Sequence, residues 1–166
     1  MEIGFSLGSN LGDRVHHMRE AKQRLLDVPG TRWLAQSRLF ETEPVGVQPE
    51  YVDLTFINAV LVIDTPYSAE YWLEQLHEIE HAMGRRRGAD RNAPRAMDID
   101  ILFAGTDCID SGGLVVPHPR WAQRRFVVAP LAEIRPALIL PAACRTVAAI
   151  LADLQGEAVT PLDEEW

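Results

Sequence analysis

The succession of apolar patterns along the chain constrains its fold more than any other feature. Apolar residues alternate with small or polar ones from Glu2 to Leu7, and apolar residues at helical spacing follow from Arg14 to Leu26. Strand-type patterns then run from Trp33 to Phe40 and, richer in β-branched residues, from Phe56 to Ile63. Since a period of two residues indicates a strand and a period near 3.6 a helix, the first part of the chain is predicted to be β-α-β-β.

The next segments complete a known order of elements. Ser68 is a favourable N-cap for a helix that carries apolar residues until Gly84, where a glycine ends it. A strand is predicted from Met97 to Phe103, and a short hairpin or edge strand from Asp107 to Val116. The resulting β-α-β-β-α-β order predicts an α+β fold, a ferredoxin-like sandwich with a mainly antiparallel sheet.

Two more helices are predicted beyond this unit, as additional C-terminal elements. The first spans Arg124 to Ile134, where Pro130 is expected to kink or interrupt it. The second spans Thr146 to Leu154. The sequence contains no internal repeat and no segment with the composition of a linker, so one domain covering residues 1–166 is predicted.

Composition narrows the class of protein. The chain has 166 residues, of which 47% are apolar and 24% charged, as in ordinary soluble domains. No apolar run is long enough to span a bilayer, and the N-terminus does not resemble a secretory signal. The net charge of −8 argues against nucleic acid as the main partner. Cys108 and Cys144 have no metal or redox spacing, so a cytoplasmic protein with free thiols is expected.

Positive charge is concentrated in one segment of this acidic chain. Between residues 85 and 95 there is a single acid, Asp90, and five arginines: Arg85, Arg86, Arg87, Arg91 and Arg95. Arginine presents planar, bidentate donors that match phosphate oxygens. Gly84 and Gly88 are expected to let the segment move. The segment is either a solvated surface loop or a loop that closes over a phosphate ligand.

Asp98 and Asp100 directly follow this segment and lie two residues apart in a predicted strand. Residues i and i+2 of a strand point to the same face, roughly 7 Å apart. Carboxylates and phosphate oxygens are the usual ligands of Mg²⁺, so the pair could hold magnesium for phosphoryl transfer. The alternative is an exposed strand face solvated by water. The arginines beside the pair favour polyphosphate chemistry.

Two other polar residues occupy unusual positions. Asn58 lies inside an apolar strand, where its amide must find partners. It is either a satisfied core amide or a group that reads the edge of a heteroaromatic ring. His118 lies between Pro117 and Pro119, which restrict its backbone. A single histidine of this kind is either structural or a positioned hydrogen-bond donor.

Several ordered motifs together resemble those of the 6-hydroxymethyl-7,8-dihydropterin pyrophosphokinase family, over about residues 2–141. The most specific is the Arg-x-x-Pro-Arg-x-x-Asp-x-Asp run from Arg91 to Asp100. The others are Leu7 to Asp13, Thr42 to Gly46, Phe56 to Val60, Glu80 to Arg87, Val116 to Arg120, and Arg124-x-Phe126-Val127.

The resemblance implies a folate-pathway enzyme that moves pyrophosphate from ATP to the hydroxymethyl group of 6-hydroxymethyl-7,8-dihydropterin and releases AMP. ATP would be the co-substrate. Asp98 and Asp100 would hold two Mg²⁺ ions against its phosphates. Arg85 and Arg95 match the loop arginines that settle over those phosphates during catalysis. The resemblance also leans towards a monomer.

The same resemblance assigns two sets of binding residues. Positions that contact the nucleotide are matched by Glu80, Arg87, Arg91, Ile101, His118 and Arg124. Positions that line the pterin pocket are matched by Thr42, Val45, Phe56, Asn58 and Phe126. In such a pocket, aromatic faces stack on the ring while Asn58 and backbone groups read its edge.

The sequence departs from the family pattern at two places, both on the pterin side. Asn92 stands where an aromatic residue often stacks on the pterin. The segment 47–55 is a few residues longer than the usual connection before the strand aromatic. Neither departure touches the expected metal site.

Two alternatives remain open at this stage. Asp98 and Asp100 could serve a two-metal nuclease or another nucleotidyl transferase, although Asn58 and Phe126 would then have no explanation. A ferredoxin-like module that senses a nucleotide without catalysis is the second alternative. The presence of both aspartates with Arg85 and Arg95 favours the pyrophosphokinase.

Overall fold

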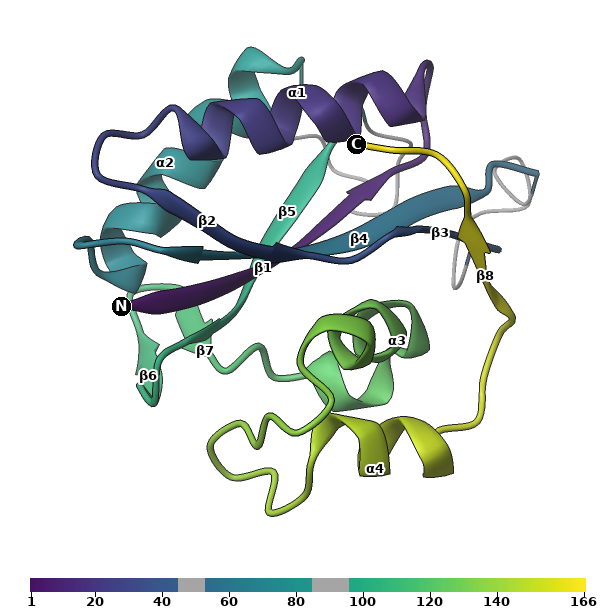
Figure 1. Ribbon diagram of the computed structural model, residues 1–166. Helices are drawn as coiled ribbons and strands as arrows, with labels where there is room; N and C mark the ends of the chain where they lie inside the picture. Colours follow the sequence, from purple (N-terminus) through teal and green to yellow (C-terminus); the bar gives the residue numbers. More distant parts are fainter. Residues whose placement is uncertain (45–52, 85–95) are drawn as a thin grey trace.

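The computed structural model describes residues 1–44, 53–84 and 96–166. In these residues a β-sheet lies between two layers of helices (Figure 1). The strands are β1 (Glu2–Ser9), β2 (Arg32–Gln36), β3 (Leu39–Thr42), β4 (Phe56–Asp64), β5 (Asp98–Ala104), β6 (Ile109–Ser111), β7 (Leu114–Val116) and β8 (Val159–Leu162). The helices are α1 (Arg14–Leu26), α2 (Ala69–Ala82), the 3-10 turn η2 (Trp121–Gln123), α3 (Arg125–Ile134) and α4 (Val147–Asp153).

The strand order confirms the predicted ferredoxin-like topology. The main sheet runs β5-β1-β4-β3-β8, and β2 also pairs with β4. All of these pairs are antiparallel. Because β2 and β3 follow one another along β4, they together occupy the place of one strand in a β-α-β-β-α-β unit. The hairpin β6–β7 forms a separate two-stranded sheet.

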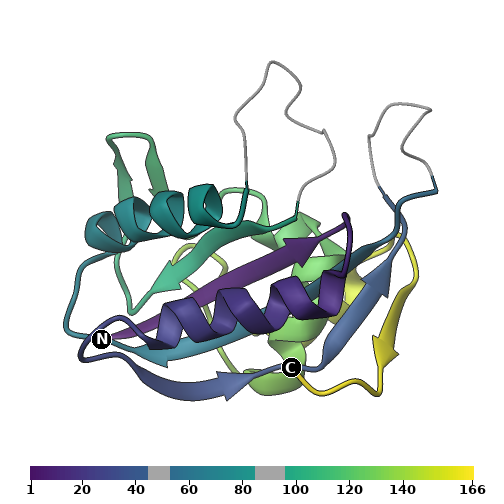
Figure 2. The same cartoon turned by 90° about the horizontal axis from the view of Figure 1, so that it is seen from above.

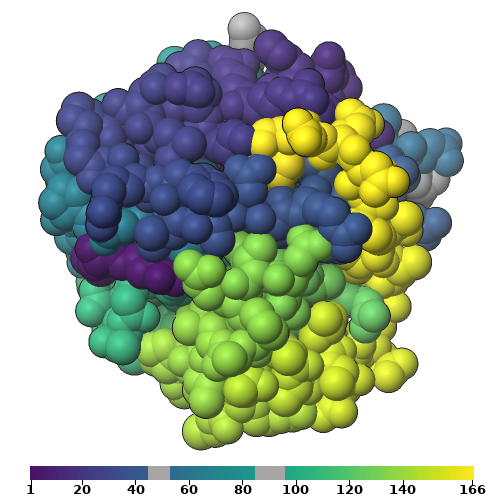
Figure 3. Space-filling view, in the orientation of Figure 1, coloured from purple at the N-terminus to yellow at the C-terminus, as the bar shows by residue number. Residues whose placement is uncertain are grey.

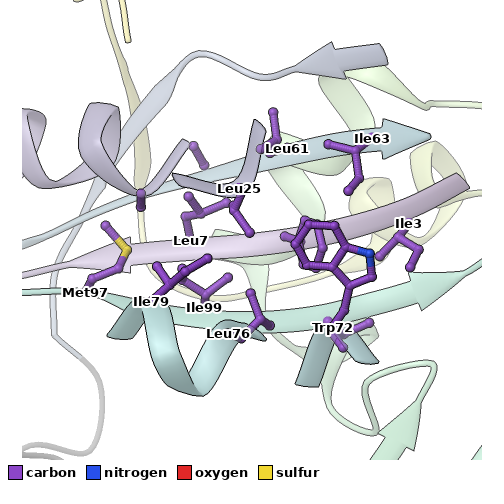
Figure 4. Close-up of a cluster of buried hydrophobic side chains, with 14 of the residues drawn as sticks. Ile3, Leu7, Leu25, Leu61, Ile63, Trp72, Leu76, Ile79, Met97 and Ile99 are labelled. Atoms are coloured by element: carbon purple, nitrogen blue, oxygen red, sulfur yellow. The ribbon is translucent and has the colours of Figure 1, made fainter. Parts of the chain in front are cut away.

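Helices α1 and α2 lie over one face of the sheet (Figure 2). The larger core lies between these helices and the sheet, and Figure 4 shows part of it. On the central strand β1, Ile3, Phe5 and Leu7 are fully buried on this face. Trp72 of α2 packs edge-to-face against Phe5, with ring centroids 5.2 Å apart. The helix boundaries follow from their caps, since Asp13 accepts a hydrogen bond from His16 N at the start of α1.

The opposite face of the sheet is covered by α3 and α4. Its core joins Val60, Val62 and Phe103 from the sheet to apolar residues of these helices. Close packing requires Gly4 at the centre of the sheet, because a Cβ there would collide with the Phe103 ring. The two cores thus flank one sheet, and β5 contributes to both, with Ile99 and Ile101 in the first and Leu102 and Phe103 in the second.

One predicted strand is divided in the structure. The prediction of a continuous strand from Trp33 to Phe40 was wrong, since β2 ends at Gln36 and β3 begins at Leu39. Between the two, the register with β4 advances by one residue. Ser37 maintains the hydrogen bonding to β4 at this bulge. Its N–H donates to Val60 O at 2.9 Å, and its hydroxyl accepts from Val60 N at 3.0 Å.

The C-terminal part differs from the prediction in two respects. Helix α3 is continuous across Pro130, so of the two expected effects of this proline, a kink or an interruption, the interruption is absent. Strand β8 was not predicted, and it pairs with β3 from Leu39↔Leu162 to Thr42↔Val159. The final segment, yellow in Figure 3, lies against the chain around β2 and β3. None of the helices in the described ranges has the length and apolar character needed to cross a membrane.

Candidate active site

Asp98 and Asp100 lie on one face of β5. This is the face of the sheet that α3 and α4 cover in other places. Their neighbours Ile99 and Ile101 point to the opposite face, and both are buried. Across the ladder, Asp98 pairs with Gly8 and Asp100 pairs with Ser6. Because both partners are small, space is left above β1 beside the two carboxylates. The structure therefore confirms that the two side chains share one face of β5. It also shows an open space beside them, above β1.

A cavity of about 160 Å³ occupies that space. We call it the aromatic cavity, and its lining residues are Ser6, Gly8, Thr42, Glu43, Phe56, Asn58, Asp98, Asp100, Arg124 and Phe126. Strands β1, β3 and β4 supply its floor, and Phe126 at the start of α3 faces it. Since an apolar cavity of roughly 150 Å³ can hold a benzene ring, this partly open cavity is of a size that suits a flat heteroaromatic ligand.

Asn58 is held in place by a neighbour in the same cavity. Its side chain is 4% exposed, and Nδ2 donates to Thr42 Oγ1 at 2.7 Å. Gly8 pairs with Asn58 on one side and with Asp98 on the other. A Cβ at position 8 would approach Asn58 Oδ1 to 3.1 Å. Asn58 is thus a satisfied amide that also lines a ligand-sized space, so the two interpretations of the sequence are compatible.

A second cavity, of about 310 Å³, lies along the outer edge of β5. We call it the edge cavity, and it is lined by Leu73, Leu76, His77, Glu80, Asp98, Ile99, Asp100, Ile101, Gly113, Leu114, Val115, His118 and Pro119. Helix α2 forms one wall, and β7 with the following segment forms the other. Of the described residues, only Asp98 and Asp100 line both cavities.

Glu80 supports the strand that carries the aspartates. Its side chain is 4% exposed, and Oε1 accepts a hydrogen bond from Ile99 N at 2.9 Å. Among the described residues β5 pairs only with β1 in the main sheet, so the Ile99 N–H points away from a strand partner. A buried carboxylate from α2 satisfies this donor. Glu80 therefore fixes the backbone between Asp98 and Asp100.

His118 lies near Asp100 and is neutral at physiological pH. Its Nε2 is 3.7 Å from Asp100 Oδ2, and its Nδ1 accepts from Arg120 N at 3.1 Å. Burial, followed by the nearby charges of Arg124 and Arg120, lowers the pKa of His118 to about 4. Because Nδ1 is an acceptor, the neutral ring carries its proton on Nε2. His118 thus presents a donor toward the carboxylate pair.

Arg124, which lines the aromatic cavity, places a positive charge near Asp100. Its Nη1 lies 3.7 Å from Asp100 Oδ2, and its guanidinium carbon lies 5.7 Å from the centre of the Phe126 ring. Burial and the neighbouring Arg120 lower the pKa of Arg124 from its usual value. Sequence reasoning grouped Arg124 with the nucleotide, whereas the structure places it in the lining of the aromatic cavity.

The remaining predicted positions divide into two groups. Thr42, Phe56, Asn58 and Phe126 meet in the aromatic cavity, and Glu80, Ile101 and His118 meet in the edge cavity. Outside the described residues lie Val45, Arg85, Arg87, Arg91 and Arg95. Sequence reasoning missed Ser6, Gly8 and Glu43. The alternation of small residues with apolar ones along β1 was the available signal for the first two.

Comparison with known proteins shows the family of the chain. The model of the family described as 7,8-dihydro-6-hydroxymethylpterin-pyrophosphokinase (HPPK) matches residues 4–136. The 2-amino-4-hydroxy-6-hydroxymethyldihydropteridine pyrophosphokinase of Bacillus subtilis is 39% identical over 129 residues, which are 78% of this chain and 75% of the relative. The folic acid synthesis protein fol1 of Pneumocystis carinii is 33% identical over 160 residues, which are 96% of this chain but 21% of that protein.

A solved structure shows the same fold. The crystal structure of wild-type Plasmodium falciparum HPPK-DHPS with pteroate superposes with a TM-score of 0.71 and 16% identity. It covers 91% of this chain and 42% of that one. The chain thus spans about three quarters of the Bacillus relative, but less than half of the Plasmodium protein and about a fifth of the Pneumocystis one.

Fold and cavities define an α+β protein with two cavities that meet at a carboxylate pair. The family match covers most of the chain and includes all the residues of that pair and of both cavities. The chain belongs to the 7,8-dihydro-6-hydroxymethylpterin-pyrophosphokinase family.

Proposed function

We propose that this chain transfers the pyrophosphoryl group of ATP to 6-hydroxymethyl-7,8-dihydropterin and releases AMP, as a step of folate synthesis. The observation that carries the proposal is the meeting of two cavities at Asp98 and Asp100. Two substrates that react with each other need adjoining sites and a shared point of charge neutralisation. The names of the bacterial relatives support the choice of substrates.

The aromatic cavity has the features that a pterin requires. Phe56 and Phe126 offer aromatic faces for a flat ring. Asn58 supplies a buried amide whose Nδ2 is oriented by Thr42. Since Asn58 and Asp98 flank Gly8 on neighbouring strands, a ring recognised at Asn58 extends across the floor towards the carboxylates. This orientation brings a hydroxymethyl arm to the boundary between the cavities.

The edge cavity suits the nucleotide. Ile99 and Ile101 line it beside the outer edge of β5, and His118 directs its Nε2 side toward Asp100. A neutral His118 can donate a hydrogen bond to a phosphate oxygen without changing its protonation state. The Glu80 carboxylate also holds the Ile99 N–H, so part of its proposed effect on ATP acts through the position of β5.

The carboxylate pair fits magnesium that arrives with a nucleotide. Within the described ranges, no group of three or more His, Cys, Asp or Glu side chains is arranged to hold an ion. Mg²⁺ bound with ATP needs only one or two carboxylates, because phosphates and water complete its shell. We propose that Asp98 and Asp100 hold two Mg²⁺ ions, which would neutralise charge on the transferred phosphates when bound.

The chain's own residues then perform the positioning. In the step, the pterin hydroxyl oxygen bonds to the β-phosphorus as the bond from that phosphorus to the bridging oxygen of AMP breaks. The hydroxyl proton passes to solvent water, because none of the described residues near the pair is a strong general base. Arg124 and His118 place donors beside Asp100, where they help to orient phosphate oxygens. Arg85 and Arg95 stay predictions as phosphate-binding arginines.

Other expectations belong to the same proposal. One sheet shared by two cores supports a single domain over residues 1–166. Cys108 and Cys144 are both free and exposed, as expected for a cytoplasmic protein. We propose that the protein acts as a monomer on its two small substrates.

Identification of the nucleotide product tests the proposal. The protein is incubated with ATP, Mg²⁺ and 6-hydroxymethyl-7,8-dihydropterin, and the nucleotides are separated. We expect AMP in a one-to-one ratio with pterin diphosphate. Formation of ADP instead would mean single-phosphate transfer, and AMP formed equally well without pterin would favour a nucleotide hydrolase.

A further inference from the structure

Three side chains outside both cavities connect the start of α1 to β3 and to the residue that precedes β4. Arg14 Nη1 donates to the carbonyl oxygen of Thr55 at 2.9 Å and to its Oγ1 at 2.6 Å. Arg14 Nη2 lies 2.8 Å from Glu41 Oε2. The Thr55 hydroxyl donates to the same Glu41 oxygen at 3.1 Å. Each side chain of this group, which we call the Arg14 cluster, therefore contacts the other two.

The Arg14 cluster lies directly behind a wall of the aromatic cavity. The last described pair of β3 and β4 joins Thr42 to Phe56, and both line the cavity. Glu41 and Thr55 are the chain neighbours of these two residues, so alternation turns them to the opposite face of the sheet. That face carries α1, whose first residue is Arg14. The cluster thus lies at the end of the β3–β4 ladder, on the face of the sheet opposite the aromatic cavity.

At this position the cluster affects the local spacing of β3 and β4 more than the overall stability of the fold. The Arg14 and Glu41 side chains are 28% and 37% exposed, and ion pairs at such exposure contribute little to overall stability. Beyond Thr42 and Phe56 the described ladder has no further pair. The guanidinium therefore replaces strand pairing at the point where Thr42 and Phe56 must hold their spacing. Thr42 in turn orients the Asn58 amide.

We propose that the Arg14 cluster is a positioning device for pterin binding. Arg14 holds Glu41 and Thr55 together, and this fixes Thr42 and Phe56 at the separation that the pterin ring requires. The inference rests on the proposed function, because it takes the ligand of the aromatic cavity to be the pterin. None of the three residues lines the aromatic cavity.

The test measures binding and turnover separately. Pterin affinity is measured by calorimetry in the presence of a non-hydrolysable ATP analogue, and the KM values for pterin and ATP are measured by AMP release. We expect Arg14→Ala to weaken pterin binding about tenfold, since small displacements of positioning groups are costly, while the KM for ATP changes by less than about twofold. Arg14→Lys, which keeps the charge, should recover part of the affinity.

Two isosteric variants and one control complete the design. Thr55→Val removes the hydrogen bonds of the hydroxyl, and Glu41→Gln removes the charge of the ion pair, each with little change in shape. They serve if Arg14→Ala folds poorly. Arg24 is the matched control, because it lies on the same helix and forms an ion pair with Glu20 at 2.8 Å that involves neither β3 nor β4. Arg24→Ala should leave the pterin affinity unchanged.

The outcomes separate this inference from the proposed function. Weaker pterin binding in the Arg14 and Thr55 variants, with ATP unaffected, supports the cluster. Unchanged pterin binding in both, or equal losses for pterin and ATP with a lower melting temperature, overturns it while the function stands. If the wild-type protein binds pterin but forms no AMP, the proposed transfer fails, and the binding data still decide the role of the cluster.

Discussion

Asn58 and Asp98 lie in one row across the sheet, because each pairs with Gly8 from the strand on either side. Neighbouring strands are about 4.8 Å apart, so the backbones of the two residues are separated by roughly 10 Å. The row therefore links an amide that can recognise a ring edge to the carboxylate pair. We infer that it sets the direction in which the pterin lies.

Gly8 is expected to be intolerant of a side chain. A Cβ at this position enters the floor of the aromatic cavity and approaches Asn58 Oδ1 to 3.1 Å. One added methyl group in a binding pocket commonly costs tenfold or more, so Gly8→Ala should raise the pterin KM about tenfold. The KM for ATP should be unaffected, since Gly8 does not line the edge cavity. Steady-state kinetics with each substrate varied checks this, and equal changes in both constants would contradict it.

Glu80 should stabilise the fold through the backbone of β5. Glu80→Ala removes the acceptor of the Ile99 N–H at a site that is 4% exposed. Leaving a buried donor without a partner costs about 1–3 kcal/mol, and the free energy of unfolding should fall by that amount in urea titrations. Glu80→Gln retains an acceptor and should lose less. Equal stability of Glu80→Ala and the wild-type protein would show that water replaces the carboxylate.

His118 should remain neutral throughout the physiological range. Its pKa in the fold is lowered to about 4, chiefly by burial, whereas an unfolded histidine titrates near 6.5. Between these values the unfolded chain binds more protons, so His118 makes the ligand-free protein less stable as pH falls from about 6.5 to about 4. NMR titration of the ring should show a midpoint near 4 and a proton on Nε2. A midpoint near 6.5 would refute this description.

Trp166 should anchor the C-terminal segment. The residue is 7% exposed, and its Nε1 donates to Ser37 O at 2.8 Å. Gln36 and Lys22 donate to its backbone oxygen, and Lys22 also lies 5.1 Å from the ring centre. Trp166→Ala should lower the free energy of unfolding by about 3 kcal/mol, in the range of buried aromatic truncations. A loss below about 0.5 kcal/mol, the size of an ordinary surface change, would mean that the segment packs independently of the domain.

Much of the fold was predictable because local signals and burial agree. The alternation from Glu2 to Leu7 and the N-cap Ser68 mark their elements correctly. The break after Gln36 was not predictable, because it depends on bonds between Ser37 and Val60 on another strand. Strand β8 was missed for a similar reason: it is short, contains Pro161, and exists because the edge of β3 was available to pair with it.

Less of the site than of the fold was predictable from the sequence. The spacing of Asp98 and Asp100 correctly placed both carboxylates on one face. Sequence order alone could not show that the pair forms the boundary between two cavities, since Asn58, Phe126 and His118 come from separate elements. The Arg14 cluster was also missed, because its contacts join residues 14, 41 and 55 and no local pattern marks them.

The central claim is that the two substrates meet at Asp98 and Asp100, and Asp98→Ala tests it most directly. Calorimetry measures the affinity of the variant for pterin and for the ATP analogue, and product analysis measures AMP release. We predict that AMP formation falls by roughly 10³-fold or more, because the variant loses charge neutralisation at the reacting phosphates, while the folded variant still binds pterin. Turnover at the wild-type rate would contradict the claim and would remove the carboxylate pair from the mechanism.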